Sequence, residues 1–434
     1  MIAERACGQR FHCMQRPYPL RWEVTGKPAH PHRPDKIFPQ ICRPPVRKQY
    51  LSGQTGGAAE AAPFQDKFKL THYPTLGGIE NDETKRYSVN DARDPTSHHG
   101  SLTHAMKAAI LRTAKDPANP LQIEEVPQPQ TATGQVLLRV RACGVCRTDL
   151  HIVEGELPPR KEALIPGHQI VGIVEEGATA ELPLGTRVGV SWLGGIDGSC
   201  PYCRRGLENL CDSPVFTGYT VNGGYAEYAV ARSDFVYKLP SGLDDLHAAP
   251  LLCAGIIGFR SLRVAGVEPG ERVGLFGFGA SAHLAIAVLR SWNCEVYVST
   301  RGASHRQLAA SLGAAWVGSE TDKPPIELDR AVTFAPSGDV VISALASLRK
   351  GGIVAINAIH LDRIPEFDYD RLLWGERQIR SVANMTRSDA RDFLRIAADI
   401  QLQPKVTVFP LERANDALAA VKNDAVDGAA VIVP

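Results

Sequence analysis

The sequence predicts an α/β fold in which a β-rich domain precedes a doubly wound parallel sheet. Residues 134–142 alternate apolar and polar side chains as a half-buried strand does. More strand-like segments, separated by Gly and Pro, follow up to about residue 240, among them 170–175 and 187–191. From about residue 255, short apolar strands alternate with helical stretches, for example 272–276, 282–292, 295–299 and 305–312. That alternation is typical of βαβ units, which build parallel sheets.

Composition excludes several classes of partner. The chain has 434 residues, of which 44% are hydrophobic and 22% charged, enough for two packed domains. Its 48 Lys and Arg nearly balance 47 Asp and Glu, so the net charge of +1 gives no reason to expect nucleic acid or an anionic membrane as partner. No apolar run reaches the roughly 18 to 20 residues of a spanning helix, and the start lacks the apolar core of a secretory signal. We therefore expect a cytoplasmic protein.

Residues 1–105 differ from the rest of the chain. They hold 11 of the 31 prolines and 15 Lys plus Arg against 10 Asp plus Glu, without a sustained helical or strand period. Such a segment cannot bury enough apolar surface to offset its chain entropy, so we expect it to be disordered. A basic targeting sequence or a binding tail are alternatives. We favour an over-long start, because residues 106–111 resemble a natural beginning for an N-terminal strand.

The cysteines indicate metal or thiolate chemistry. Three of them, Cys7, Cys13 and Cys42, lie in the irregular first segment and suggest nothing firm. The odd number that remains, in a chain without an export signal, argues against a disulfide framework. These seven are Cys143, Cys146, Cys200, Cys203, Cys211, Cys253 and Cys294.

One set of residues predicts a catalytic zinc site. It comprises Cys146 in Gly-Val-Cys-Arg-Thr-Asp-Leu-His, His168 in Pro-Gly-His-Gln, and Cys253 in Leu-Cys-Ala-Gly. Two thiolates and one imidazole leave the fourth position of a tetrahedral zinc ion open to substrate, and the ion lowers the pKa of a coordinated hydroxyl. The alternative is that the cysteines are small buried apolar residues and the histidine a turn residue. The three local contexts together favour the metal.

A second set predicts a structural zinc site. Cys200, Cys203 and Cys211 form a Cys-x2-Cys-x7-Cys cluster in a Gly-rich loop. Three thiolates need a fourth ligand, and Asp197 stands three residues before the first cysteine, where a carboxylate oxygen could close the site. The alternative is a metal-free loop with vestigial thiols.

A dinucleotide-binding turn follows the strand 272–276. Gly-x-Gly-x-x-Ala between a strand and a helix permits a tight turn, close backbone approach and a pyrophosphate at the helix N-terminus. The expected cofactor contacts are Gly277, Gly279, Ala280, Ser281 and Ala282. The weak motif gains specificity from its place in a βαβ unit.

The next strand predicts the choice of cofactor. It ends in Thr300 and Arg301, with Arg306 nearby, where an acidic residue would bind an adenosine ribose 2′-hydroxyl. Small hydroxyls and arginine suit a 2′-phosphate better, so NADP(H) is predicted in preference to NAD(H). The alternative is that these are solvated loop residues and selectivity is loose.

Over residues 106–434 the chain resembles the zinc-dependent alcohol dehydrogenases of the medium-chain dehydrogenase/reductase superfamily. The resemblance rests on the motifs around Cys146, His168, the 200–211 loop, Cys253 and Gly277. It implies a GroES-like catalytic domain over 106–254, a Rossmann domain over 255–385, and a C-terminal segment, 386–434, that returns to the catalytic domain. It also implies a homodimer or homotetramer acting on a small alcohol or aldehyde.

The resemblance also implies roles for single residues. Cys146, His168 and Cys253 would bind the catalytic zinc, and Thr148 would hydrogen-bond the zinc-bound alcohol oxygen and begin a proton relay through the cofactor ribose. His151 would pass the proton to solvent, which a pKa near neutrality suits. Asp149 would orient His168. Arg147 would lie near the cofactor pyrophosphate.

Two departures from the family pattern concern the metal sites. Gln169 stands where many members have Glu, which removes a transient anionic ligand, and Asp197 stands where a fourth cysteine would complete the structural site. Two other functions stay open. A polyol dehydrogenase of the same superfamily shares the hydride chemistry, although the cysteine-rich loop and Thr148 favour simple alcohols. A non-catalytic nucleotide-binding relative would normally have lost some of the three zinc ligands.

Overall fold

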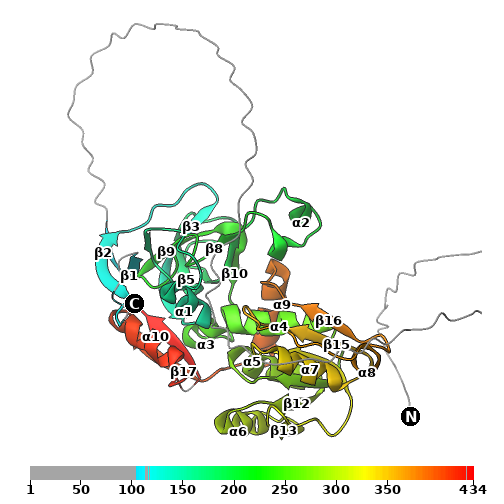
Figure 1. Ribbon diagram of the computed structural model, residues 1–434. Coiled ribbons are helices and arrows are strands. Elements are labelled where there is room, and N and C mark those ends of the chain that lie inside the picture. The colour runs from blue at the N-terminus through cyan, green and yellow to red at the C-terminus, as the bar shows by residue number, and fades with distance from the viewer. Residues whose placement is uncertain (1–103, 113–115, 117, 427) are drawn as a thin grey trace, which may run out of the picture. The chain divides into compact units, whose positions relative to one another are not determined.

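The computed structural model describes residues 104–112, 116, 118–426 and 428–434, all of which belong to one compact unit, Pro95–Pro434 (Figure 1). The disorder expected for residues 1–105 therefore concerns residues that lie almost wholly outside the described part, as do Cys7, Cys13 and Cys42. The strand expected near residue 106 is present as β1 (Ala105–Arg112).

The β-rich part contains one large mixed sheet and two small ones. The large sheet has seven strands in the order β10-β6-β5-β3-β18-β17, with β9 also paired to β3. Its strands are β3 (Gln135–Gly144), β5 (Gln169–Glu176), β6 (Arg187–Val190), β9 (Tyr228–Arg232), β10 (Val236–Lys238), β17 (Val406–Pro410) and β18 (Ala429–Val433). The small sheets pair β1 with β2 (Leu121–Pro127) and β4 (Ala163–Leu164), and β7 (Leu193–Gly195) with β8 (Val215–Phe216).

Alternation along β3 explains its central position. Val136, Leu138 and Val140 lie in one apolar core, whereas Arg139 pairs with Glu175 at 2.5 Å on the other face. The C-terminal end of the chain completes this sheet, because β18 runs antiparallel to β3. Figure 1 shows α10 (Ala414–Lys422) beside β1 and β2, where Asn415 exchanges two hydrogen bonds with the backbone of Leu121.

The second part is a doubly wound sheet of six parallel strands, as predicted. The strand order is β13-β12-β11-β14-β15-β16. From β11 the first strands are added toward one edge of the sheet and the later strands, beginning with β14, toward the other edge, and ligands bind at this switch point in such sheets. The strands are β11 (Arg272–Phe276), β12 (Glu295–Ser299), β13 (Trp316–Gly318), β14 (Leu328–Thr333), β15 (Leu348–Ile356) and β16 (Gln378–Ser381). The helices are α4 (Ile256–Ala265), α5 (Ala280–Ser291), α6 (Ala303–Ser311), α7 (Gly338–Ala346), α8 (Tyr369–Leu372) and α9 (Arg387–Asp399).

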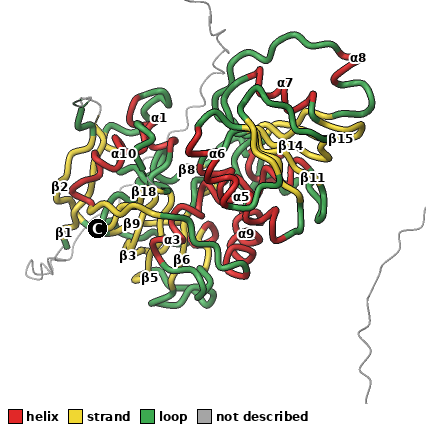
Figure 2. Tube along the Cα trace, turned by 90° about the horizontal axis from the view of Figure 1, so that it is seen from below, coloured by secondary structure: helices red, strands yellow, loops and turns green. Residues whose placement is uncertain are grey.

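Helices cover both faces of this sheet because its strands are apolar on both faces. Leu275 and Val298 pack with α4, α5 and α9 in one core, whereas Tyr297 and Val354 pack with α7 in another. Figure 2 shows α7 on one side of β14 and β15, and α5 with α9 on the other. The sheet is therefore buried on both faces.

One sequence expectation requires correction. α3 (Asp245–Pro250), a π-helical turn (Leu251–Gly255) and α4 run on as a helical stretch of 21 residues that is long and apolar enough to span a membrane. Two thirds of its most apolar window are nevertheless buried inside the protein. Packing of α4 against α5 and α9 accounts for the apolar composition. No uninterrupted apolar run marks this stretch in the sequence, because Asp245, His247 and Arg260 divide it.

Candidate metal and cofactor sites

Three side chains from separate segments meet beside the large sheet. Cys146 follows β3, His168 precedes β5, and Cys253 lies in the π-helical turn, yet their ligand atoms are all within 4.8 Å of one another. The two sulfurs are 3.8 Å apart. Sulfurs about 2.3 Å from a tetrahedral zinc ion would lie about 3.8 Å from each other. The spacing therefore fits the metal that the sequence predicts for these residues.

Local backbone geometry positions His168. Gly167 has φ +91°, and a Cβ there would lie 2.4 Å from Cδ1 of Tyr225, so only glycine fits without displacement of that ring. On the other side, Gln169 is buried and begins β5. The histidine is thus fixed between a tight turn and a sheet hydrogen-bond ladder.

A buried carboxylate holds the histidine ring. The Oδ1 atom of Asp149 lies 3.1 Å from Nδ1 of His168, and both side chains are completely buried. Its Oδ2 atom accepts hydrogen bonds from the Cys146 N–H at 2.8 Å and from the Tyr225 hydroxyl at 3.1 Å. The Nε2 atom of His168 is buried without a hydrogen-bond partner among the described residues. A ring nitrogen in that position can serve as a metal ligand.

The charges of this centre attract a cation. Burial lowers the pKa of His168, but Asp149 and the Cys146 thiolate outweigh burial and raise the pKa to about 10. A hydrogen bond from Cys253 lowers the pKa of Cys146 well below its usual range, and the same bond raises the pKa of Cys253. The buried carboxylate and thiolate therefore favour a proton on the His168 ring in the metal-free chain, and a divalent cation bound at Nε2 would take the place of that proton.

Thr148 and His151 lie on helix α1 (Arg147–Glu154), which begins at the first cysteine. The hydroxyl of Thr148 is buried 3.7 Å from Sγ of Cys146. His151 lies one turn further along the same helix face, where Nδ1 hydrogen-bonds Oε2 of Glu156. The two predicted relay residues therefore lead away from the cysteines toward solvent. Arg147 makes an exposed ion pair with Asp424 at 2.9 Å.

Aromatic side chains form a wall beside the three ligands. The indole of Trp192 lies edge-on to the His168 ring with 5.2 Å between ring centroids. It stacks on Phe216 at 4.8 Å and on Tyr219 at 5.9 Å. These rings give the surroundings of His168 an apolar surface.

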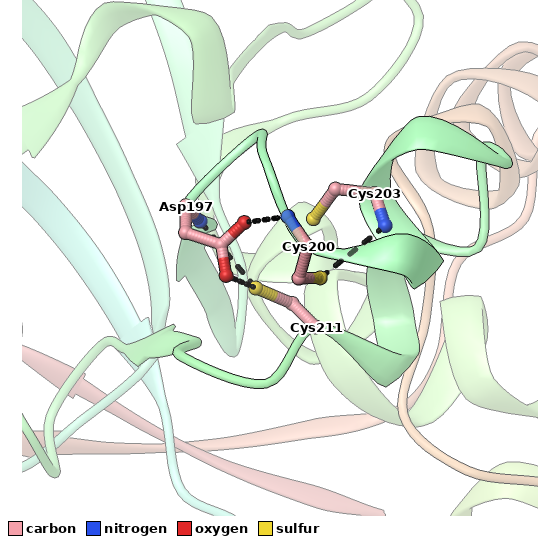
Figure 3. Close-up of side chains that lie close together, drawn as sticks. All are labelled: Asp197, Cys200, Cys203 and Cys211. Carbon is pink, nitrogen blue, oxygen red and sulfur yellow. Dashed lines mark hydrogen bonds between the residues drawn. The ribbon is translucent and has the colours of Figure 1, made fainter.

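The four side chains of the second predicted cluster lie close together in one loop (Figure 3). Asp197 follows β7, Cys200 and Cys203 belong to the start of α2 (Pro201–Arg204), and Cys211 follows the short helix Glu208–Leu210. Their four ligand atoms lie within 4.8 Å of one another. Oδ1 of Asp197 accepts the Ser199 and Cys200 N–H groups, which leaves Oδ2 3.3 Å from Sγ of Cys211. The carboxylate thus lies where a fourth ligand would be needed beside the three sulfurs.

Backbone N–H groups surround this cluster as they would a metal-bound thiolate. The Cys203 N–H donates to Sγ of Cys200, and the Asp197 and Ser213 N–H groups donate to Sγ of Cys211, each at 3.4 Å. Hydrogen bonds from the Cys200 and Ser199 N–H groups hold the pKa of Asp197 well below its usual range. Burial and the neighbouring thiols raise the pKa of Cys203 to about 12. A cation would be needed to ionise all three thiols together.

The glycine-rich turn lies at the carboxyl end of β11. Gly277 has φ +89°, and a Cβ there would lie 2.8 Å from the Ala335 nitrogen, so both conformation and space require glycine. Gly279 is the N-cap of α5, where an added Cβ would meet nothing within 4 Å. The open space and the free N–H groups of Ala280, Ser281 and Ala282 suit a pyrophosphate.

Arg301 and Arg306 behave differently at the end of β12. The Arg306 guanidinium donates to the backbone carbonyls of Thr300 at 3.0 Å and Arg301 at 2.5 Å, so it shapes the loop. The side chain of Arg301 is 81% exposed and lies 3.5 Å from Glu320. The Thr300 residue is buried. Of these three, Arg301 is best placed to meet a ligand arriving from solvent.

Sequence reasoning missed several neighbours of these sites. Tyr225 and Trp192 touch His168 or its carboxylate from loops whose sequences carry no distinctive motif. Glu156 could have been identified, because Gly155 after α1 is a typical helix-ending signal that turns the chain back. His360, whose ring lies 5.3 Å from that of His151, comes from the other part of the fold.

Fold and site together define a medium-chain dehydrogenase: a GroES-like part with a two-cysteine, one-histidine centre joined to a doubly wound sheet. The alcohol dehydrogenase GroES-like domain family matches residues 132–241. A probable alcohol dehydrogenase AdhA of Mycobacterium tuberculosis is 47% identical over 331 residues, covering 75% of this chain and 96% of the relative. An alcohol dehydrogenase of Geobacillus stearothermophilus is 37% identical over 339 residues, 75% of this chain and 99% of the relative.

A solved structure shares the fold of this chain. The alcohol dehydrogenase from Pyrobaculum aerophilum, with cobalt and zinc bound, aligns with a TM-score of 0.68 at 25% identity, over 76% of this chain and all (100%) of that one. The chain belongs to the alcohol dehydrogenases of the medium-chain dehydrogenase/reductase superfamily, a family of oxidoreductases.

Proposed function

We propose that the protein is a zinc-dependent dehydrogenase that interconverts a primary or simple alcohol and its aldehyde or ketone with NADP(H) in preference to NAD(H). One observation carries this proposal: two sulfurs 3.8 Å apart face the unpartnered Nε2 of a histidine held by a buried carboxylate. Cys146, His168 and Cys253 would hold the zinc. Asp197 and the three cysteines of its loop would hold a second, structural ion.

Bound zinc supplies a Lewis acid, and the nicotinamide supplies the hydride acceptor. The Thr148 hydroxyl, buried beside Cys146, accepts the proton of the alcohol and releases its own proton outward. His151, one turn along α1, would stand at the outer end of the relay, where a ring nitrogen takes up a proton and exchanges it with solvent. Asp149 keeps the proton of His168 on Nδ1 and so leaves Nε2 free as a ligand.

The cofactor preference rests on Arg301. Its guanidinium is exposed and paired weakly with Glu320, so an incoming 2′-phosphate could replace that partner and form a charge-assisted hydrogen bond. Arg306 would support the loop through its carbonyl contacts rather than bind the phosphate itself. The substrate preference rests on the aromatic wall around Trp192.

The proposal is tested by combining metal analysis with absorbance at 340 nm across a panel of alcohols and aldehydes. We expect Cys146→Ser to lose one zinc per chain and nearly all turnover. Cys294→Ser is the matched control, because this buried thiol lies away from both clusters and donates to the Glu268 carbonyl at 3.5 Å, a contact that serine can keep. Unchanged zinc content and turnover in Cys146→Ser would overturn the assignment.

A further inference from the structure

A third group of metal-ligating side chains lies outside both cysteine clusters. Ligand atoms of His151, Glu156 and His360 are all within 4.8 Å of one another. His151 hydrogen-bonds Glu156 through Nδ1, and the His360 ring lies edge-on to the His151 ring at an interplanar angle of 72°. Two imidazoles and a carboxylate therefore converge on a single point.

The backbone brings these residues together from two parts of the fold. Helix α1 ends at Glu154, and Gly155 adopts φ +86°, which reverses the chain. The Leu157 N–H then donates to the His151 carbonyl at 3.1 Å, so the intervening Glu156 is held beside the histidine. His360 lies on the loop that follows β15 of the parallel sheet. The group is thus held by a helix turn on one side and by the sheet part on the other.

We propose that His151, Glu156 and His360 form a binding site for Zn²⁺, additional to the two cysteine-containing sites. Imidazole nitrogen and carboxylate oxygen are accepted zinc ligands, and three of them leave one position for water. The side chain of Glu156 is 52% exposed and that of His151 22% exposed, so an ion can reach the site from solvent. The partial exposure predicts reversible binding, weaker than at the thiolate sites.

Occupancy of this site inhibits turnover, an inference that rests on the proposed function. A metal-bound ring nitrogen of His151 cannot take up a proton from the relay that begins at Thr148. The same ion would tie α1 to the loop after β15 and so restrain movement of these two elements relative to each other. Excess zinc is therefore expected to act as an inhibitor, although zinc is also required at the centre formed by Cys146.

Binding is tested without reference to turnover. The full chain, with its cysteine sites already loaded, is titrated with Zn²⁺ by calorimetry, and we expect one further equivalent to bind. His360→Asn and Glu156→Gln should each weaken this binding at least about tenfold. His247→Asn is the matched control, since His247 is a partly exposed histidine that pairs with Asp244 at 2.6 Å, and it should leave the titration unchanged.

Inhibition is tested by dehydrogenase assays over a range of Zn²⁺ concentrations. His360→Asn should keep its basal turnover and require at least about tenfold more zinc for half-inhibition. The site is refuted if no further equivalent binds to the wild-type chain, or if both variants bind it as tightly as the wild type does. Equal zinc inhibition in wild type and His360→Asn refutes the inhibitory role. A chain that binds the equivalent through these residues but oxidises no alcohol supports the site and overturns the proposed function instead.

Discussion

Substitution of Asp149 by Asn tests how the catalytic metal is held. The carboxylate is completely buried and accepts three hydrogen bonds, from His168, Cys146 and Tyr225. Asparagine has nearly the same shape, and its carbonyl oxygen can keep the Cys146 and Tyr225 contacts. Its NH₂ group would then face Nδ1 of His168, which must become an acceptor. The proton moves to Nε2, the nitrogen needed for the metal.

The size of the effect follows from the bond that is lost. A hydrogen bond to a charged group contributes about 1.5–3 kcal/mol. At about 1.4 kcal/mol per factor of ten, Asp149→Asn should bind zinc at the Cys146 centre about 10- to 100-fold more weakly. Loss of a partner that orients a ligating histidine usually has a similar effect.

The assay is metal analysis after equilibration with a competing chelator at graded free zinc. Asp389→Asn is the matched control, because Asp389 is also a buried carboxylate but caps α9 and pairs with Arg260 at 2.6 Å. The control should lower thermal stability and leave zinc affinity unchanged. If Asp149→Asn retains zinc as tightly as the wild type, the carboxylate does not orient the ligand and the reasoning is wrong.

Four further predictions follow from the same structure. Thr148→Ala should lower kcat about 100- to 10,000-fold whereas Thr148→Ser should retain most activity, as measured by steady-state kinetics; equal rates for the two would remove the hydroxyl from the relay. Cys203→Ser should release the structural ion while the catalytic zinc remains, which metal counting with and without chelator will show, and unchanged metal content would contradict the site. Arg301→Gln should lower kcat/KM for NADPH by about tenfold or more and leave that for NADH unchanged; equal losses with both cofactors would exclude recognition of the 2′-phosphate. Burial raises the pKa of the Asp329 carboxyl, but hydrogen bonds from Arg349 and Arg272 outweigh burial, so the pKa is lowered in the folded protein. Asp329→Asn removes this charged partner of the two arginines and should therefore destabilise the fold by about 1–2 kcal/mol at neutral pH. Because its pKa is lower in the folded than in the unfolded state, the carboxylate stabilises the fold at pH values above its unfolded pKa of about 3.9, and this stabilisation is lost as the pH falls through the folded pKa. The difference between the chemical-denaturation midpoints of wild type and variant should therefore shrink below about pH 4 and stay unchanged above about pH 7.

Much of the fold could be predicted because its signals are local. The segments 272–276 and 295–299 were predicted as strands and are β11 and β12 with those same bounds. Their apolar runs are bounded by turn residues, so the spacing of apolar residues and the length of each run are enough to predict a strand. Helix α5 begins at Ala280, two residues before the apolar stretch from which it was predicted, because its first turn is set by the glycine-rich turn rather than by core packing.

The sites were predictable to the extent that their ligands carry motifs. Cys146, His168 and Cys253 do lie together, as do the four side chains of the Asp197 loop. Contacts between distant segments were not predictable, because neither partner has a local reason to face the other. The Tyr225 hydroxyl on Asp149 and the His360 ring beside His151 both depend on how separate loops pack. The place of Arg306 in the loop after β12 led to the prediction that it contacts the cofactor. Its hydrogen bonds to the backbone carbonyls of Thr300 and Arg301 could not be predicted from that place.

The π-helical turn Leu251–Gly255 makes the length of its segment as important as its chemistry. Each helical residue rotates the chain by about 100° about the helix axis, so deletion of Ala254 would restore an ordinary α-helix only by turning one flank relative to the other. Either Cys253 would swing away from the other sulfur, or α4 would present the wrong side chains to α5. This segment should therefore tolerate exchanges between apolar residues far better than insertions or deletions. Protein engineers who graft it onto another scaffold should keep its length.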